Sequence, residues 1–336
     1  MTKNNPKRKY KLSIGGHRGN GQTDHPDLNA NDYVQKYPEN TLASIEAAIK
    51  AGADFIEIDV VLSKDAIPMV IHGNDLREHV FKQELPEDKY FVGQYTSQEL
   101  QGMRVGRRES RDATIPTLMQ VMEMLAKRNR ASKSRDRPAI MLNIELKGVR
   151  GTDAPRRKSP HLAEAVHKAI EASELQPEHI LLSSFVQTYL KETKEVMPNI
   201  ARGMLFTAVE DQGYGQKTFL HEADNGDVSC YDAFASDRVR QLHAQLELCA
   251  VHPEMTHLVR PDDARDLLTA LSQDKCYRSP IGKKLAVNTW CLQENANEAM
   301  DATIMGVIER VSKCGLPLGI ITNHIKRLRV LADTLL

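Results

Sequence analysis

Short apolar segments alternate with helix-like patterns along nearly the whole chain, and this alternation restricts the fold more than any other feature of the sequence. Such alternation is typical of parallel α/β folds, in which each helix crosses over to the next strand. Nine segments have the composition of strands: residues 11–16, 54–61, 67–72, 140–147, 179–185, 201–206, 246–251, 284–290 and 318–322. Helical patterns lie at residues 41–53, 116–127, 161–173, 261–272 and 296–312.

A closed TIM (β/α)8 barrel, regular or distorted, fits this pattern best. A doubly wound sheet usually has a glycine-rich first turn, and GGHRGNG (15–21) lacks the GxGxxG spacing. Because nine strands exceed the eight of a barrel, we expect one to lie outside it or to form a local hairpin around the SKD turn (63–65). Residues 73–115 are polar and hold no clear strand–helix unit, which indicates a loop insertion. The whole chain, 1–336, is then a single barrel domain.

The first helical pattern has clear local boundaries. An apolar stripe runs through TLASIEAAIKAGA (41–53), as expected for a helix that packs on a sheet. Asn40 stands where an N-cap is expected, and Gly52 stands where a helix commonly stops.

Composition limits the classes of partner. Lys plus Arg and Asp plus Glu number 45 each, so no net field attracts nucleic acid or an acidic membrane, and we expect neither partner. No apolar run approaches the ~18 residues of a membrane span, and no apolar segment of a secretory signal follows the basic N-terminus. The five cysteines are widely spaced, which favours a reducing, cytoplasmic location over a disulfide or zinc framework.

Carboxylates interrupt two of the apolar strands. Glu57 and Asp59 lie two residues apart in DFIEIDVV (54–61) and share one face, because strand side chains alternate. Glu145 lies late in IMLNIELK (140–147), on the face opposite the leucines and isoleucine. Each acid could pair with a buried Lys or Arg. Three acids near strand ends instead favour one hard divalent cation, Mg²⁺ or Ca²⁺.

Two histidines also lie at strand ends. His17 follows the first strand between glycines, and His72 ends IPMVIH (67–72). A single histidine in such a place is more often structural. A pair beside a metal site suits proton transfer, because the pKa of histidine lies near neutrality.

The order of these motifs resembles the glycerophosphodiester phosphodiesterase family. The motifs are HRG (17–19), PENT (38–41), AGADFIEIDVVLSKD (51–65), PMVIH (68–72), NIELK (143–147) and SSF (183–185). Weaker matches extend the resemblance over about residues 11–325.

This resemblance implies a TIM-barrel enzyme that splits glycerophosphodiesters into glycerol 3-phosphate and an alcohol, with a small-molecule substrate. It also implies a role for each motif residue. The cation ligands are Glu57, Asp59 and Glu145, the catalytic pair is His17 and His72, the phosphate contacts are Arg18 and Lys147, and Glu39 and Trp290 line the substrate pocket. The sequence does not say which histidine is the base, nor what the oligomeric state is.

Several positions depart from the family pattern. Residues 20–37 separate HRG from PENT, and we expect them to line or cover the pocket. The usual HD becomes HGND, so Asp75 is the candidate replacement for the missing acid. Trp290, the only tryptophan, fits a pocket wall or a buried core position equally well.

Two other functions fit the same sequence. A related enzyme could cleave a lipid phosphodiester, but residues 20–37 and 73–115 are mostly polar, which favours a water-soluble substrate. The second alternative is a catalytically silent binding protein on the same fold. The acid–base pair His17 and His72 argues against it, because binding alone needs no such pair.

Overall fold

The computed structural model describes the chain over residues 12–20, 37–80, 85–106, 113–133, 138–147, 162–206, 236–259, 261–275, 279, 283–290 and 298–334. The segment 20–37 predicted to approach the substrate therefore lies almost wholly outside the described residues.

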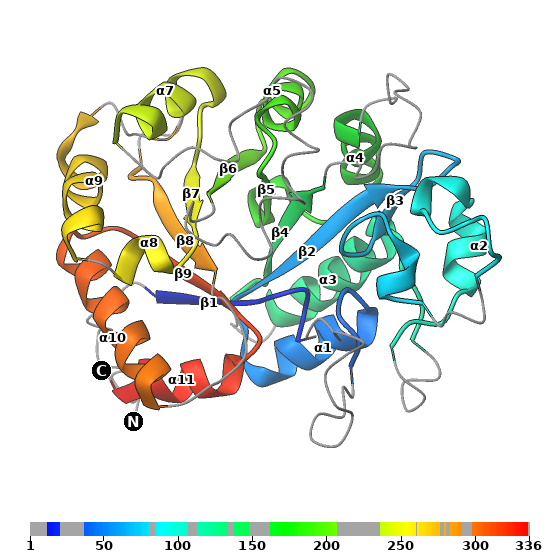
Figure 1. Cartoon of the computed structure of the whole chain (residues 1–336), viewed down its shortest axis with the longest axis horizontal. Helices are drawn as coiled ribbons and strands as arrows, with labels where there is room; N and C mark the ends of the chain where they lie inside the picture. Colours follow the sequence, from blue (N-terminus) through cyan, green and yellow to red (C-terminus); the bar gives the residue numbers. More distant parts are fainter. Residues whose placement is uncertain are drawn as a thin grey trace.

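Eight parallel strands close into a barrel with helices around it, which confirms the predicted TIM fold (Figure 1). β1 pairs with β9 on one side and with β2 on the other, through Gly15–Phe55 and Gly16–Ile56, and these pairings close the sheet. The barrel strands are β1 (Leu12–Gly16), β2 (Phe55–Leu62), β4 (Met141–Leu146), β5 (Ile180–Ser184), β6 (Ala201–Phe206), β7 (Ala250–Pro253), β8 (Ala286–Trp290) and β9 (Leu318–Thr322).

The ninth strand is the hairpin expected around the SKD turn. β3 (Pro68–Val70) runs antiparallel to β2, with Val60 opposite Val70 and Leu62 opposite Pro68. The chain therefore rises along β2, turns at residues 63–67 and comes back beside it. This return matters for the site, because it brings the residues after β3 down to the level of Asp59.

Helices cover the outside of the barrel (Figure 1). They are α1 (Leu42–Ala51), α3 (Leu118–Lys133), α4 (Leu162–Ala172), α5 (Gln187–Val196), α7 (Ser236–Leu246), α8 (Thr256–Val259), α9 (Pro261–Gln273), α10 (Glu298–Lys313) and α11 (Ile325–Thr334), with the short 3₁₀ turn η4 (Pro177–His179) before β5. α1 ends at Gly52, whose φ of 100° is left-handed, as predicted. Its N-cap is Thr41, whose side chain accepts from the Ser44 backbone N–H. The prediction of Asn40 as N-cap was wrong, because that side chain bonds to Asp59 instead.

Strand residues alternate between two environments. In β4, Leu142, Ile144 and Leu146 are buried in the apolar layer between barrel and helices. Asn143 and Glu145 point the other way, into the barrel. The barrel interior therefore collects polar side chains, and the apolar core lies outside the barrel wall.

The insertion has a small core of its own. It contains η1 (Leu76–Glu78), η3 (Val92–Gln94) and α2 (Ser97–Gly102). Nine of its described apolar residues, among them Leu76, Val92 and Leu100, are buried and pack together with three from the β2–β3 hairpin. The prediction of a polar loop without structure was therefore incomplete, because the apolar residues are too widely spaced to give a period. Their packing fixes the loop that follows His72.

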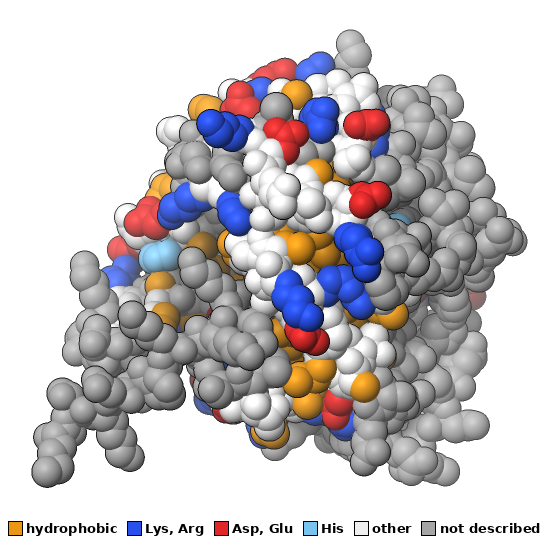
Figure 2. Space-filling model, turned by 90° about the vertical axis from the view of Figure 1, so that its left-hand side faces the viewer, with side chains coloured by type: hydrophobic (Ala, Val, Ile, Leu, Met, Phe, Trp, Pro, Cys, Tyr) orange, Lys and Arg blue, Asp and Glu red, His pale blue; other side chains and the backbone are white. Residues whose placement is uncertain are grey.

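Charges of both signs are interspersed on the face shown in Figure 2, with only small apolar areas between them. This agrees with the equal numbers of acidic and basic residues. Among the described helices, none combines the length and apolar character needed to cross a bilayer.

Candidate active site

Three carboxylates converge at one end of the barrel interior. Asp59 on β2 lies opposite Glu145 on β4 in register, and Glu57 lies one pleat below Asp59. One oxygen from each carboxylate lies within 4.8 Å of the other two. All three side chains are buried, with exposed fractions of 3%, 1% and 8% for Glu57, Asp59 and Glu145. The structure thus brings together the acids that strand alternation predicted.

Two cations neutralise part of this charge. Lys147 Nζ lies 2.7 Å from Glu145 Oε1 and 3.4 Å from Asp59 Oδ1, and Arg18 Nε lies 3.3 Å from Asp59 Oδ2. Burial alone would raise the pKa of Asp59, but Lys147, Arg18 and the Asn40 amide together lower it. Asp59 and Glu145 are therefore each paired with a buried Lys or Arg side chain, which compensates part of their negative charge.

Glu57 is different. Its Oε2 accepts from the Arg18 backbone N–H at 2.9 Å, while its buried Oε1 has no hydrogen-bond donor among the described residues. Burial raises the pKa of Glu57 well above its usual value, and the charges of Asp59 and Glu145 raise it further. The pKa of Glu145 is also raised, first by burial, although Lys147 opposes this. This excess of negative charge and the unmatched oxygen fit a hard divalent cation.

His17 follows β1 at the same end of the barrel. Its backbone N–H donates to Thr322 O, and its Nδ1 lies 3.3 Å from Asn323 Oδ1. Burial, with a further effect of Arg18, lowers the pKa of His17 to about 4. The imidazole is therefore neutral at physiological pH. With Nδ1–H donating to Asn323, Nε2 carries the lone pair.

His72 reaches the site through the β2–β3 hairpin. It was predicted to end the strand at 67–72, and this strand is β3, which runs antiparallel to β2. The hairpin returns the chain to the level of Asp59, where Ile71 N–H donates to Asp59 O at 3.1 Å. His72 then lies beside Glu39, with one ring nitrogen within 4.8 Å of a Glu39 oxygen.

Glu39 is tied to Arg18, because Arg18 Nη1 donates to both Glu39 oxygens at 3.1 Å. Burial alone would raise the pKa of this carboxyl, but Arg18, His79 and His17 together lower it. Arg18 thus bridges Glu39 and Asp59, and it joins the PENT turn to the three carboxylates.

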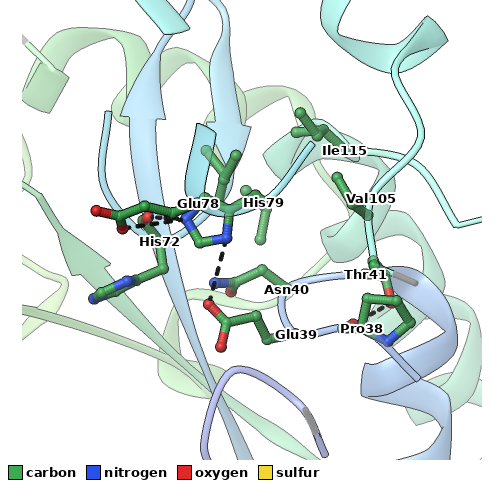
Figure 3. Close-up of a pocket in the computed structure, with 12 residues that line it drawn as sticks. Pro38, Glu39, Asn40, Thr41, His72, Glu78, His79, Val105 and Ile115 are labelled. Atoms are coloured by element: carbon green, nitrogen blue, oxygen red, sulfur yellow. Dashed lines mark hydrogen bonds and ion pairs between the residues drawn. The ribbon is translucent and has the colours of Figure 1, made fainter. Parts of the chain in front are cut away.

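Two residues of this region were missed by the sequence reasoning. Asn40 bonds Asp59 twice: its Nδ2 donates to Asp59 Oδ2, and its Oδ1 accepts from the Asp59 backbone N–H. His79, from the insertion, lies between the His72 backbone and Glu39 (Figure 3). Asn40 has a left-handed φ of 57°, and its place in PENT was the available signal. Nothing in the sequence around His79 indicated its position.

Comparison with known proteins identifies the family that the sequence motifs resemble. A family model described as the glycerophosphoryl diester phosphodiesterase family matches residues 17–265. The chain belongs to this family. A glycerophosphodiester phosphodiesterase of Bacillus altitudinis is 32% identical over 172 residues, which is 50% of this chain and 61% of that protein. One of Caldanaerobacter subterraneus subsp. tengcongensis is 29% identical over 174 residues, with the same two coverages. The match thus spans about three fifths of these relatives.

Solved structures confirm the fold. A crystal structure from Silicibacter pomeroyi DSS-3, described as a putative glycerophosphoryl diester phosphodiesterase, has a TM-score of 0.64 at 20% identity, covering 97% of this chain and 95% of that one. A phosphodiesterase of Oleispira antarctica, solved in complex with the product sn-glycerol-3-phosphate, has a TM-score of 0.58 at 19% identity and covers 96% of each chain.

The structure also locates two further residues that the sequence singled out, Asp75 and Trp290. Asp75 caps η1, and its carboxylate accepts a hydrogen bond from Arg77 Nε at 2.9 Å. The Asp75 carboxylate is therefore bound within the insertion. Trp290 ends β8 and packs edge-on against Phe185, with ring centroids 5.9 Å apart. Its Nε1 donates to His252 O. Phe185 also lies under Lys147 Nζ, 6.0 Å from the ring centroid, so Trp290 is one side chain away from the phosphate-binding candidate.

Proposed function

We propose that this protein hydrolyses glycerophosphodiesters to glycerol 3-phosphate and an alcohol, with one divalent cation held by Glu57, Asp59 and Glu145. The observation that carries the proposal is the buried carboxylate cluster with its unmatched Glu57 oxygen. Membership of the family and the printed activity of the relatives support it. A product complex of a structural neighbour supports the product class.

An all-oxygen set of three carboxylates favours Mg²⁺ or Ca²⁺ over softer metals. When bound, such a cation would supply electrostatic stabilisation of the negative charge that develops on the phosphate oxygens. Arg18 and Lys147 are positioned for the same task from the protein side. Both now bind Asp59, and once the carboxylates are neutralised their N–H groups can turn to phosphate oxygens.

The two histidines divide the proton transfers. Neutral His17, with its lone pair on Nε2, suits the general base that takes a proton from the attacking oxygen. That oxygen belongs to water or to the neighbouring glycerol hydroxyl of the substrate. His72 then protonates the leaving alkoxide. The two imidazoles come from different elements, β1 and the β2–β3 hairpin, and can therefore stand on opposite sides of a bound phosphate.

Turnover of glycerophosphocholine tests this proposal. The protein is stripped of metal, reloaded with Mg²⁺ or Ca²⁺, and assayed for glycerol 3-phosphate. We expect turnover that EDTA abolishes and that His17→Asn or His72→Asn lowers by about 10²–10⁴-fold. His167→Asn, which removes a partly exposed imidazole on α4, is the matched control and should keep full activity.

Near-native activity of both the His17 and the His72 variants would remove the acid–base assignment, and full activity in EDTA would remove the cation. If the metal-loaded protein hydrolyses no glycerophosphodiester but cleaves a lipid phosphodiester in vesicles, the substrate belongs to the lipid class instead.

We also propose a reducing compartment such as the cytoplasm, because Cys249 and Cys314 carry free thiols.

A further inference from the structure

We propose that Glu39, His72 and His79 form a second metal site, selective for a borderline transition metal such as Zn²⁺, whose occupation inhibits the enzyme. One ligand atom from each side chain lies within 4.8 Å of the other two. Ligands of a tetrahedral Zn²⁺ site are about 3.3 Å apart at the usual bond lengths, so small side-chain shifts would close the set. The inhibitory part of this inference rests on the proposed function of His72.

The hydrogen bonds of His79 fix which nitrogen is available. His79 Nε2 lies 2.6 Å from His72 O, and a carbonyl oxygen can only accept, so Nε2 carries the proton. In the neutral ring, Nδ1 then points its lone pair at the Glu39 carboxylate, with Nδ1 3.8 Å from Oε1. A lone pair facing a carboxylate at this distance is unfavourable unless positive charge lies between them. A metal ion bound by both atoms would provide that charge, as would a proton on Nδ1.

The supporting contacts are those that metal ligands usually have. A metal-binding histidine normally donates its other ring N–H to a carbonyl or carboxylate, which fixes its orientation. His79 does this with the His72 carbonyl. A ligating carboxylate is normally hydrogen-bonded as well, and Glu39 accepts from Arg18 Nη1. Oε1 keeps a second lone pair for a metal.

The ligand chemistry separates this site from the carboxylate cluster. Two imidazoles and one carboxylate suit Zn²⁺ or Co²⁺, whereas three carboxylates suit Mg²⁺ or Ca²⁺. Arg18 lies between the two sets, bound to Glu39 on one side and to Asp59 on the other. The sites therefore share no ligand, and each can be emptied separately.

The site is well shielded. The side chains of Glu39 and His79 are only 7% and 8% exposed. Figure 3 shows them in the pocket beside His72, from the PENT turn and the insertion. A metal on the His72 nitrogen would remove the lone pair that must carry a proton, so occupation and turnover exclude each other.

Co²⁺ is the direct probe, because imidazole ligands in a site of four or five ligands give strong visible absorption and an octahedral all-oxygen site does not. The Mg²⁺-loaded protein is titrated with Co²⁺. We expect one equivalent to give this absorption and Zn²⁺ to abolish it by displacement. His79→Gln should weaken Co²⁺ binding at least about tenfold, because it removes one ligand. Glu57→Gln should leave the absorption in place.

His167→Gln is the matched control, since His167 Nε2 lies 3.4 Å from Glu171 in an ordinary surface pair. Absent absorption in the wild-type protein, or absorption that survives His79→Gln, would overturn the site. Loss of the signal in Glu57→Gln alone would place the metal in the carboxylate cluster and also overturn it.

A second readout concerns inhibition. Zn²⁺ should inhibit Mg²⁺-supported turnover, and His79→Gln should raise the half-inhibiting Zn²⁺ concentration at least about tenfold, measured against the basal rate of that variant. Equal Zn²⁺ sensitivity of both proteins would contradict the inhibitory role. If the absorption depends on His79 but no diester is hydrolysed, the site stands and the proposed function fails.

Discussion

Glu57 is the buried carboxylate of the site for which no Lys or Arg partner lies within ion-pair distance among the described residues. Glu145 and Glu39 each have one, and Asp59 has two. Burying an uncompensated charge is costly, and a charge of this kind is usually neutralised by protonation or by a metal. The raised pKa of Glu57 expresses the first route, and the proposed cation supplies the second.

Glu57→Gln therefore has opposite effects with and without the cation. The folded-state pKa of Glu57 lies above its unfolded value, so its contribution to stability is present at low pH and lost as pH rises. In EDTA, the wild-type protein should lose stability relative to Glu57→Gln between pH 5 and pH 8, measured by urea unfolding. With Ca²⁺, activity of the variant should fall at least about hundredfold.

Glu46→Gln is the control, since Glu46 forms an exposed pair with Lys50 on α1. A constant stability difference between wild type and Glu57→Gln across this pH range would show that the buried charge is already compensated.

At the scale of residues, alternation along strands was enough to predict the convergence of Glu57, Asp59 and Glu145. The period of two assigns them to one face, and the barrel brings their strands together. His79 could not be predicted in this way, because it belongs to an insertion without a period. Its position depends on the packing of residues such as Leu76 and Val92 around it.

At the scale of elements, strand ends and hairpins decide what reaches the site. The strands 201–206 and 318–322 were predicted at their observed bounds. The strand predicted at 246–251 is β7, Ala250–Pro253, because Leu246 still belongs to α7. α3 likewise continues through residues 128–133. The turn chemistry at 63–67 indicated a hairpin, but only the antiparallel pairing explains how His72 comes back to Asp59.

The interior of the barrel is fitted closely where β6 and β7 meet. Gly203 on β6 faces the His252 ring, and a Cβ there would lie 2.5 Å from His252 Nε2. Gly203→Ala should therefore destabilise the protein by about 1–3 kcal/mol. The cost should be smaller in a His252→Ala background, as a double-mutant cycle would measure.

Gly306→Ala serves as the control, because a Cβ there meets nothing within 4 Å and the residue lies inside α10. It should be neutral or stabilising, by up to about 1 kcal/mol. An equal cost of Gly203→Ala in both backgrounds would show that the His252 ring is not what fills the space beside Gly203.

His252 also makes stability depend on pH. It is fully buried, its Nε2 accepts from Asn288 Nδ2 at 3.2 Å, and burial lowers its pKa from 6.5 to about 3. The unfolded chain therefore binds a proton that the folded chain does not between these two values, so stability falls as pH is lowered. This contribution amounts to about 3 kcal/mol between pH 7 and pH 4.5.

His252→Gln removes the titration. The free energy of unfolding of the wild-type protein should fall relative to the variant by that amount over this range, in urea titrations at the two pH values. A difference that stays constant with pH would mean that His252 has the same pKa in the folded and the unfolded protein.

At the scale of the whole molecule, barrel closure joins residues that are far apart in the chain. β1 lies between β9 and β2, so His17 can contact Asn323 while Arg18 reaches Glu39 and Asp59. The pattern of alternating strands and helices predicted this topology. Contacts across the closure depend on register, which sequence patterns do not specify. The site is thus a property of the closed barrel and not of any one motif.

The central claim is that a single cation joins β2 and β4 beside the two imidazoles. The most direct measurement is a crystal structure of the protein with Ca²⁺ and glycerol 3-phosphate, with the ion located by anomalous scattering. We predict one ion at about 2.3–2.6 Å from oxygens of Glu57, Asp59 and Glu145, and a phosphate in contact with His17 and His72. An ion bound elsewhere, or a phosphate that touches neither imidazole, would contradict the account.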